Sequence, residues 1–201
     1  MYRTLATAIQ DLYDITVSPD GLLITDAMVR RVNEARKDRD PKGIGDALSE
    51  LFKGVASKAA GFQLKDFTHD EIGRRVGWLM DADVTKESTV RQFLAKYQRD
   101  LAMPAMETGI RLGAAQGLVK EVVRTPEGAD TCQWCLDRCG VWDPYDANAY
   151  GVWARHGASA HGGSGGCDCD IRIRWRMRDD GTNDSQTGGE AASAAETGLH
   201  L

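Results

Sequence analysis

The five cysteines of this chain all lie between Cys132 and Cys169, and the long stretches on either side contain none. Cys132 and Cys135 form a Cys-x-x-Cys pair, a spacing at which one tight turn brings both sulfurs to the same side. Cys167 and Cys169 form a Cys-x-Cys pair, and residues two apart in an extended segment point the same way. Each pair can therefore present two sulfurs to a single metal ion.

Zinc is the metal that these residue types favour, because proteins hold it in a tetrahedron of four ligands, usually cysteine sulfur and histidine nitrogen. Two histidines, His156 and His161, precede the Cys-x-Cys pair, and the Gly-rich run after His161 allows either imidazole to fold back. The candidate metal ligands are Cys132, Cys135, His161, Cys167 and Cys169.

These candidates outnumber the four places of a tetrahedral site. The first choice is Cys132, Cys135, His161 and Cys167, with Cys169 next, and His156 stays open as an alternative to His161. Cys139 suits the site least, because three residues separate it from Cys135 and Gly140 should begin a return turn.

A zinc ion with four protein ligands has no open position for water, so the predicted site is structural and the chain is not predicted to be an enzyme. The nearby aspartates show no general-base pattern, and aspartates in Gly-rich loops usually form turns. Reduced, partly buried thiols and a disulfide are the alternatives, although an odd number of cysteines opposes complete pairing. A redox Cys-x-x-Cys is weaker, because that motif normally opens a helix after a strand.

The bulk composition is that of an ordinary globular protein, with 42% apolar and 27% charged residues. No apolar run is long enough to cross a membrane, and the N-terminal segment carries Asp11 and Asp14 where a secretory signal would be apolar. We therefore expect a cytoplasmic protein with reduced thiols. The formal charge of −5 excludes general attraction to nucleic acid, but not a local basic strip.

Helical periodicity runs through the first two-thirds of the chain. It predicts helices at Leu5–Leu12, from about Thr25 to Lys37, over Ile44–Ala59 and, after a capping box at Thr68–Glu71, onward to Leu79. The longest predicted helix runs from about Lys86 to Val122, and Pro104 should kink or split it. Its glycines at 109, 113 and 117 share one face, which favours tight packing within the chain over a subunit contact.

Beyond Val119 the pattern changes to that of strands and turns. Residues 119–124 form a short segment rich in β-branched residues. Residues 171–178 alternate strictly between apolar residues and arginine, which predicts a half-buried strand. Residues 179–201 have almost no large apolar residue and should form a flexible tail. The predicted fold is α+β, with a helical domain (1–118), a small β-rich zinc-binding module (119–178) and the tail (179–201).

The segment from Thr131 to Trp142, together with His161 and Cys167–Cys169, resembles the C-terminal part of phage Mu F-like minor head proteins, also called head morphogenesis proteins. The resemblance covers roughly residues 85–175, including the long helix before the cysteines. This chain has a longer spacer before its second cysteine pair, and Cys139 is an additional cysteine.

The resemblance implies a minor capsid protein that associates with the portal and inner capsid of a tailed bacteriophage. Its expected locations are the virion and, during assembly, the cytoplasm of the bacterial host. Aromatic residues of the module suit either an interaction surface or packing around the metal: Trp134, Trp142, Tyr145, Tyr150 and Trp153.

Two other functions remain open from the sequence. One is a nucleic-acid-binding zinc module that would contact phosphates, such as those of packaged DNA, through Arg172, Arg174, Arg176 and Arg178. Salt bridges or plain solvation of that strand face are the alternatives to this interpretation. The other function is a small zinc-dependent hydrolase or nuclease, for which the sequence shows no spacing of nucleophile and base.

Overall fold

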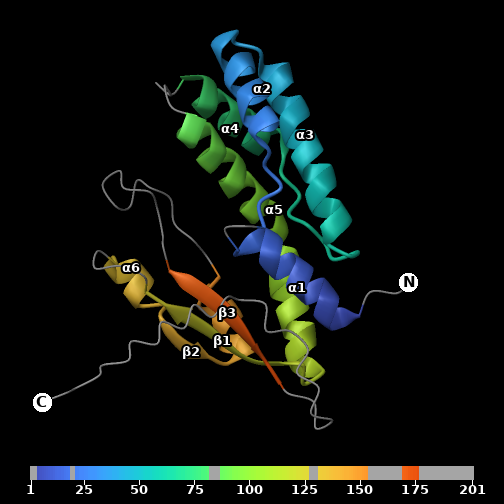
Figure 1. Ribbon diagram of the computed structural model, residues 1–201, viewed down its shortest axis with the longest axis vertical. Coiled ribbons are helices and arrows are strands. Elements are labelled where there is room, and N and C mark those ends of the chain that lie inside the picture. The colour runs from blue at the N-terminus through green and yellow to red at the C-terminus, as the bar shows by residue number, and fades with distance from the viewer. Residues whose placement is uncertain (1–3, 19–20, 82–86, 127–130, 154–168, 177–201) are drawn as a thin grey trace, which may run out of the picture.

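The computed structural model describes residues 4–18, 21–81, 87–126, 131–153 and 169–176, and its elements follow the predicted order (Figure 1). The first part of the chain forms α1 (Leu5–Thr16), α2 (Asp26–Lys37), α3 (Pro41–Lys58), α4 (His69–Asp81) and α5 (Glu87–Ala115). The later part forms β1 (Val119–Thr125), α6 (Gln133–Leu136), β2 (Gly140–Trp142), α7 (Pro144–Ala149) and β3 (Asp170–Trp175). The predicted α+β class is confirmed.

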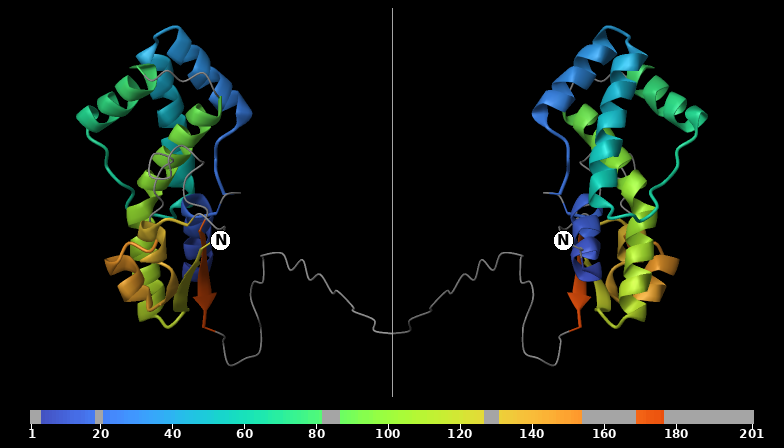
Figure 2. Two further views of the ribbon diagram at one scale, coloured as in Figure 1. Left: turned by 90° about the vertical axis from the view of Figure 1, so that its left-hand side faces the viewer. Right: turned by 90° about the vertical axis from the view of Figure 1, so that its right-hand side faces the viewer.

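Helix α5 is the axis on which the other elements are arranged (Figures 1 and 2). Helices α2, α3 and α4 gather around its N-terminal half, whereas α1 and the sheet lie beside its C-terminal half. One hydrophobic core joins both regions, with Leu51 and Leu94 among the helices and Val122 and Ile171 in the sheet. The division at residue 118 stays a prediction, and the predicted tail (179–201) lies outside the described residues.

The predicted capping box is present at the start of α4. The Glu71 backbone N–H donates to the Thr68 hydroxyl oxygen at 3.2 Å, and a Glu71 carboxylate oxygen accepts from the Thr68 N–H at 3.0 Å. This reciprocal pair satisfies two donors that the first turn of a helix leaves without partners. The hydrogen bond from the Thr68 N–H lowers the pKa of the Glu71 carboxyl group.

Helix α5 is one helix through Pro104, so the proline does not split it. Proline lacks the N–H that would bond to the Asp100 carbonyl. The neighbouring Leu101 carbonyl accepts a hydrogen bond from the Lys65 N–H at 2.9 Å, which joins the α3–α4 connection to α5.

The predicted end of α5 near Val122 is wrong, because the helix ends at Ala115. Gly117 adopts a φ of 68°, which favours glycine. The Leu118 N–H donates to the Gly113 carbonyl at 2.8 Å, and the Gly117 N–H donates to the Ala114 carbonyl at 2.9 Å. This pair of bonds is a Schellman motif, which stops the helix and turns the chain into β1.

Two glycines of α5, Gly109 and Gly113, lie directly against α1. A Cβ atom at Gly109 would lie 3.3 Å from Leu12 Cδ1. At Gly113 it would lie 2.7 Å from Ile9 Cδ1 and 2.8 Å from Val119 Cγ2. Gly109 and Gly113 are therefore packed against this chain's own α1 and β1, as the tight-packing interpretation predicted, whereas a Cβ atom at Gly117, beyond the end of α5, would meet nothing within 4 Å.

A buried glutamine fixes the connection between α1 and α2 to the side of α5. Gln98 is fully buried, and its Nε2 donates to the Ile15 carbonyl at 2.8 Å. Its Oε1 accepts from the Leu23 N–H at 2.8 Å. One side chain thus satisfies backbone groups on both sides of the bend.

The sheet has the order β2-β1-β3, and both pairings are antiparallel. Ile171 is buried and Arg172 and Arg174 are exposed, so the predicted alternation is present in β3, while residues 177–178 lie outside the described part. The Tyr13 hydroxyl of α1 donates to the Ile171 carbonyl at 2.5 Å. The first helix is therefore bonded to the last described strand.

We expect opposite effects when alanine replaces two helical glycines. Gly113→Ala should destabilise the fold by about 1–2 kcal/mol, because overpacking outweighs the helix propensity that alanine adds. Gly77→Ala in α4, where a Cβ atom meets nothing within 4 Å, should stabilise it by about 0.5–1 kcal/mol. Chemical denaturation measures both, and equal stabilisation would contradict the packing described for Gly113.

Candidate functional site

Arg124 is the only fully buried charged side chain among the described residues. It extends from β1 and donates from Nη1 to the Val152 carbonyl at 2.7 Å. Its Nη2 donates to the Cys135 sulfur at 3.5 Å, and Cys135 is itself buried. A guanidinium stays protonated in proteins, so this interior contact places a permanent positive charge beside a sulfur atom.

These contacts place Arg124 against α6 and against the chain that follows α7. Cys135 belongs to α6, and Val152 closely precedes the segment that holds both candidate histidines. Arg124 pairs with Ile171 across the sheet, and Cys169 lies two residues before Ile171. Cys169 is also buried, so it continues the inward alternation of β3 on the same face as Arg124.

The Cys-x-x-Cys segment forms a single tight turn. The N–H groups of Cys135 and Leu136 both donate to the Cys132 carbonyl at 3.0 Å. Trp134 within this turn has the Arg138 guanidinium 3.8 Å from its ring centroid and the Arg124 guanidinium at 5.4 Å. Two cations on one indole hold the turn in place against β1.

A second anchor joins the region after α7 to α5. The Trp153 indole N–H donates to Asn148 Oδ1 at 2.8 Å, and Asn148 Nδ2 donates to the Glu107 carbonyl at 3.0 Å. Trp153 is fully buried, so it packs in the core rather than on an interaction surface. Tyr145 and Tyr150 are exposed, whereas Trp134 and Trp142 are half-buried.

The predicted ligands divide between described and undescribed residues. Cys135 and Cys169 are buried and Cys132 is half-buried, whereas His156, His161 and Cys167 lie outside the described residues. Within residues 4–153 and 169–176, apart from their gaps, no three His, Cys, Asp or Glu side chains form a group that could hold a metal ion. A complete site therefore requires donors from the segment between Trp153 and Cys169.

The chemistry around Cys135 fits a metal-bound thiolate. A cation beside a cysteine favours its thiolate form, which is the form that binds metal. Arg124 itself was missed by sequence reasoning, although a signal existed. It stands two residues after Val122 in β1, at a position that alternation directs into the core.

The basic face of β3 is partly neutralised by acidic neighbours. Arg172 Nε lies 2.5 Å from an Asp170 oxygen, and Arg174 Nη1 lies 3.1 Å from a Glu121 oxygen. Arg176 is exposed, and Arg178 lies outside the described residues. The salt bridges considered as an alternative to nucleic-acid contacts are present for Arg172 and Arg174.

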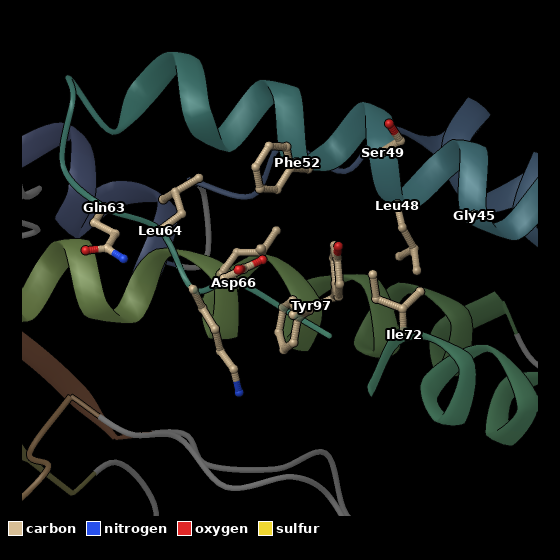
Figure 3. A pocket seen from close by; sticks show the side chains of 12 residues that line it. Gly45, Leu48, Ser49, Phe52, Gln63, Leu64, Asp66, Ile72 and Tyr97 are labelled. Atoms are coloured by element: carbon tan, nitrogen blue, oxygen red, sulfur yellow. The ribbon is translucent and has the colours of Figure 1, made fainter. Parts of the chain in front are cut away.

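A separate pocket of about 540 Å³ opens between α3, α5 and the segment that joins α3 to α4 (Figure 3). Its lining is mainly apolar and includes Phe52, Leu64 and Tyr97. Burial raises the pKa of Tyr97, and the nearby Arg75 guanidinium opposes that rise. The pocket involves neither the sheet nor any described cysteine.

Comparison with known proteins adds no relative from which a function could be transferred. No family model, curated protein or solved structure matches the chain. Of the helices in the described residues, none combines the length and the apolar character needed to cross a membrane.

The Asn148 bridge provides a test of how the module is attached to α5. Asn148→Leu should destabilise the fold by about 1–3 kcal/mol, because it leaves the Trp153 N–H without its acceptor and removes the bond from Asn148 to the Glu107 carbonyl. In a Trp153→Phe background the same change should cost less, since one of those groups is already gone. Denaturation of the wild type, the two single variants and the double variant gives the coupling free energy between Asn148 and Trp153. Strict additivity of the two single changes would show that the bond from the indole to Asn148 contributes nothing.

Proposed function

We propose that this chain is a minor capsid or head morphogenesis protein of a tailed bacteriophage, with a structural zinc module near its C-terminal end. It would associate with portal and capsid proteins in the host cytoplasm and remain in the virion. The observation that supports the proposal best is that Arg124 contacts the buried Cys135 and pairs across the sheet with Ile171, two residues after the buried Cys169.

The physical role of the metal would be to cross-link, and so stabilise, a module that has little hydrophobic core of its own. The sheet has strands of only three to seven residues, and α6 has a single turn. Such small units usually need a metal or a disulfide to be stable. Zinc would join α6 to the start of β3, in addition to the pairing of β3 with β1.

The exposed side of the module supports a role in protein contacts. Large apolar side chains are exposed on it at Leu136, Val141, Tyr145 and Tyr150. Tyrosines of this kind supply much of the binding energy at protein interfaces. Packaged DNA is the weaker candidate partner, because Arg172 and Arg174 already have acidic neighbours.

The zinc content of the full-length, reduced protein tests the module. We expect about one zinc ion per chain by elemental analysis, as one tetrahedral site requires. Cys135→Ser should abolish most of that zinc and lower the thermal stability of the fold. Cys139→Ser is the matched control, because Cys139 lies in the same segment but is not in the predicted ligand set. This variant should retain the metal.

One result would contradict the zinc module and another its predicted ligand set. The first is a folded, reduced wild-type protein with almost no zinc, and the second is equal zinc loss in the Cys135 and Cys139 variants. In the second case the metal would depend on the whole segment rather than on the predicted ligand.

The assembly role is tested in particles rather than in the isolated chain. Phage heads purified from cells that encode this protein should contain its peptides by mass spectrometry, in fewer copies than the major capsid protein. Heads from cells with a stop codon early in its gene should be fewer or misassembled. Normal, infectious heads that lack the peptides would contradict the assembly role, whatever the zinc content of the purified protein.

A further inference from the structure

The pocket beside α3 contains a buried hydroxyl group that has no hydrogen-bond partner among the described residues. This group belongs to Tyr97, which lines the pocket and is only 3% exposed. The Tyr97 ring is held in place by Phe67, which stacks on it with the two ring centroids 5.2 Å apart. Buried polar groups in folded proteins nearly always have a partner. The Tyr97 hydroxyl therefore marks a position where a bound molecule can supply one.

The walls of the pocket are apolar and extend to the protein surface. Leu48 and Phe52 point from α3 towards the space in which Leu64 and Tyr97 lie (Figure 3). Phe52 is 42% exposed, so its ring borders the solvent. A Cβ atom at Gly45, which also lines the pocket, would meet nothing within 4 Å. The pocket is therefore open along α3, and its volume of about 540 Å³ has room for a short peptide segment.

The charges around the pocket favour a cationic ligand. The two cations beside it are already paired, because Lys65 Nζ lies 3.5 Å from a Glu71 oxygen and Arg75 Nη2 lies 2.7 Å from an Asp100 oxygen. Asp66 also lines the pocket, and its exposed carboxylate forms no ion pair within the part of the chain that the structure describes. The charge that is left to attract a ligand is therefore negative.

We propose that this pocket binds a segment of a partner protein that presents a large apolar side chain next to a lysine or arginine. The apolar side chain packs between Leu48 and Leu64, the cation pairs with Asp66, and a backbone carbonyl of the segment accepts a hydrogen bond from the Tyr97 hydroxyl. The exposed rim at Phe52 favours a protein segment over a small molecule, because pockets for small molecules bury most of the ligand. The inference goes beyond the proposed function and does not rest on the zinc module.

The experiment titrates the isotope-labelled, full-length protein with capped dipeptides and follows its backbone amide signals by NMR. The probe is N-acetyl-phenylalanyl-arginine amide, and two matched peptides replace its arginine by glutamate or its phenylalanine by alanine. The signals that shift should belong to residues 45–52 and 63–67, which line the pocket. At low salt the arginine peptide should bind about three- to tenfold more tightly than the glutamate peptide. The alanine peptide should not saturate the site.

Substitutions separate binding from folding. Tyr97→Phe should weaken the arginine peptide about two- to tenfold without lowering thermal stability, because the hydroxyl that it removes has no partner among the described residues. Asp66→Asn should remove the preference for arginine. Asp38→Asn is its matched control and should keep the preference, because Asp38 is an exposed carboxylate at the end of α2 that does not line the pocket. Gly45→Leu should block binding in a folded protein, because its side chain enters open space.

Several results would overturn the inference. They are the absence of saturable binding, equal affinity for the arginine and glutamate peptides, and wild-type affinity in Tyr97→Phe. Dimerisation of the wild type that Gly45→Leu abolishes would show that a second copy of this chain occupies the pocket, so the partner inference would be wrong. None of these results depends on the zinc content of the protein or on its presence in phage heads, so a failure here is distinct from a failure of the proposed function.

Discussion

The contact between the Arg124 guanidinium and the Cys135 sulfur is the interaction on which the cysteine-bearing part of the molecule depends. It joins the central strand β1 to the short turn α6, and the same side chain reaches the chain after α7 through the Val152 carbonyl. A buried cation cannot be left without compensating contacts at acceptable cost. These segments are therefore held by this buried charge as well as by the apolar core, to which Val122, Val152 and Ile171 belong.

The helical part is stabilised differently, through close approach and internal polar bonds around α5. Gly109 and Gly113 let α1 approach α5 closely, while Gln98 satisfies the backbone where the chain bends between α1 and α2. The Schellman motif at Gly117 then directs the chain into β1. The end of α5 thus determines where the sheet begins, which places the cysteine region against the C-terminal half of that helix.

Local rules predicted those features whose causes are local. The capping box at Thr68, the arginine alternation in β3 and the helical faces are properties of neighbouring residues, and the structure has them. The end of α5 was misplaced because Leu118 continues its apolar stripe, although Gly117 stops the helix. Alternation after Val122 could have marked Arg124 as facing inward, but its contacts with Cys135 and Val152 could not be predicted, because the fold brings these partners to it.

The bond from Tyr13 to Ile171 spans 158 positions of the chain and has a consequence for the order of folding. Contacts between distant segments form slowly, because the chain must first be closed into a long loop. During synthesis α1 can settle on α5 long before β3 leaves the ribosome, whereas β1 keeps one open edge until residues 170–175 arrive. The strand that follows Cys169 is the one that closes that edge, so protection from edge-to-edge aggregation is completed only at this late step.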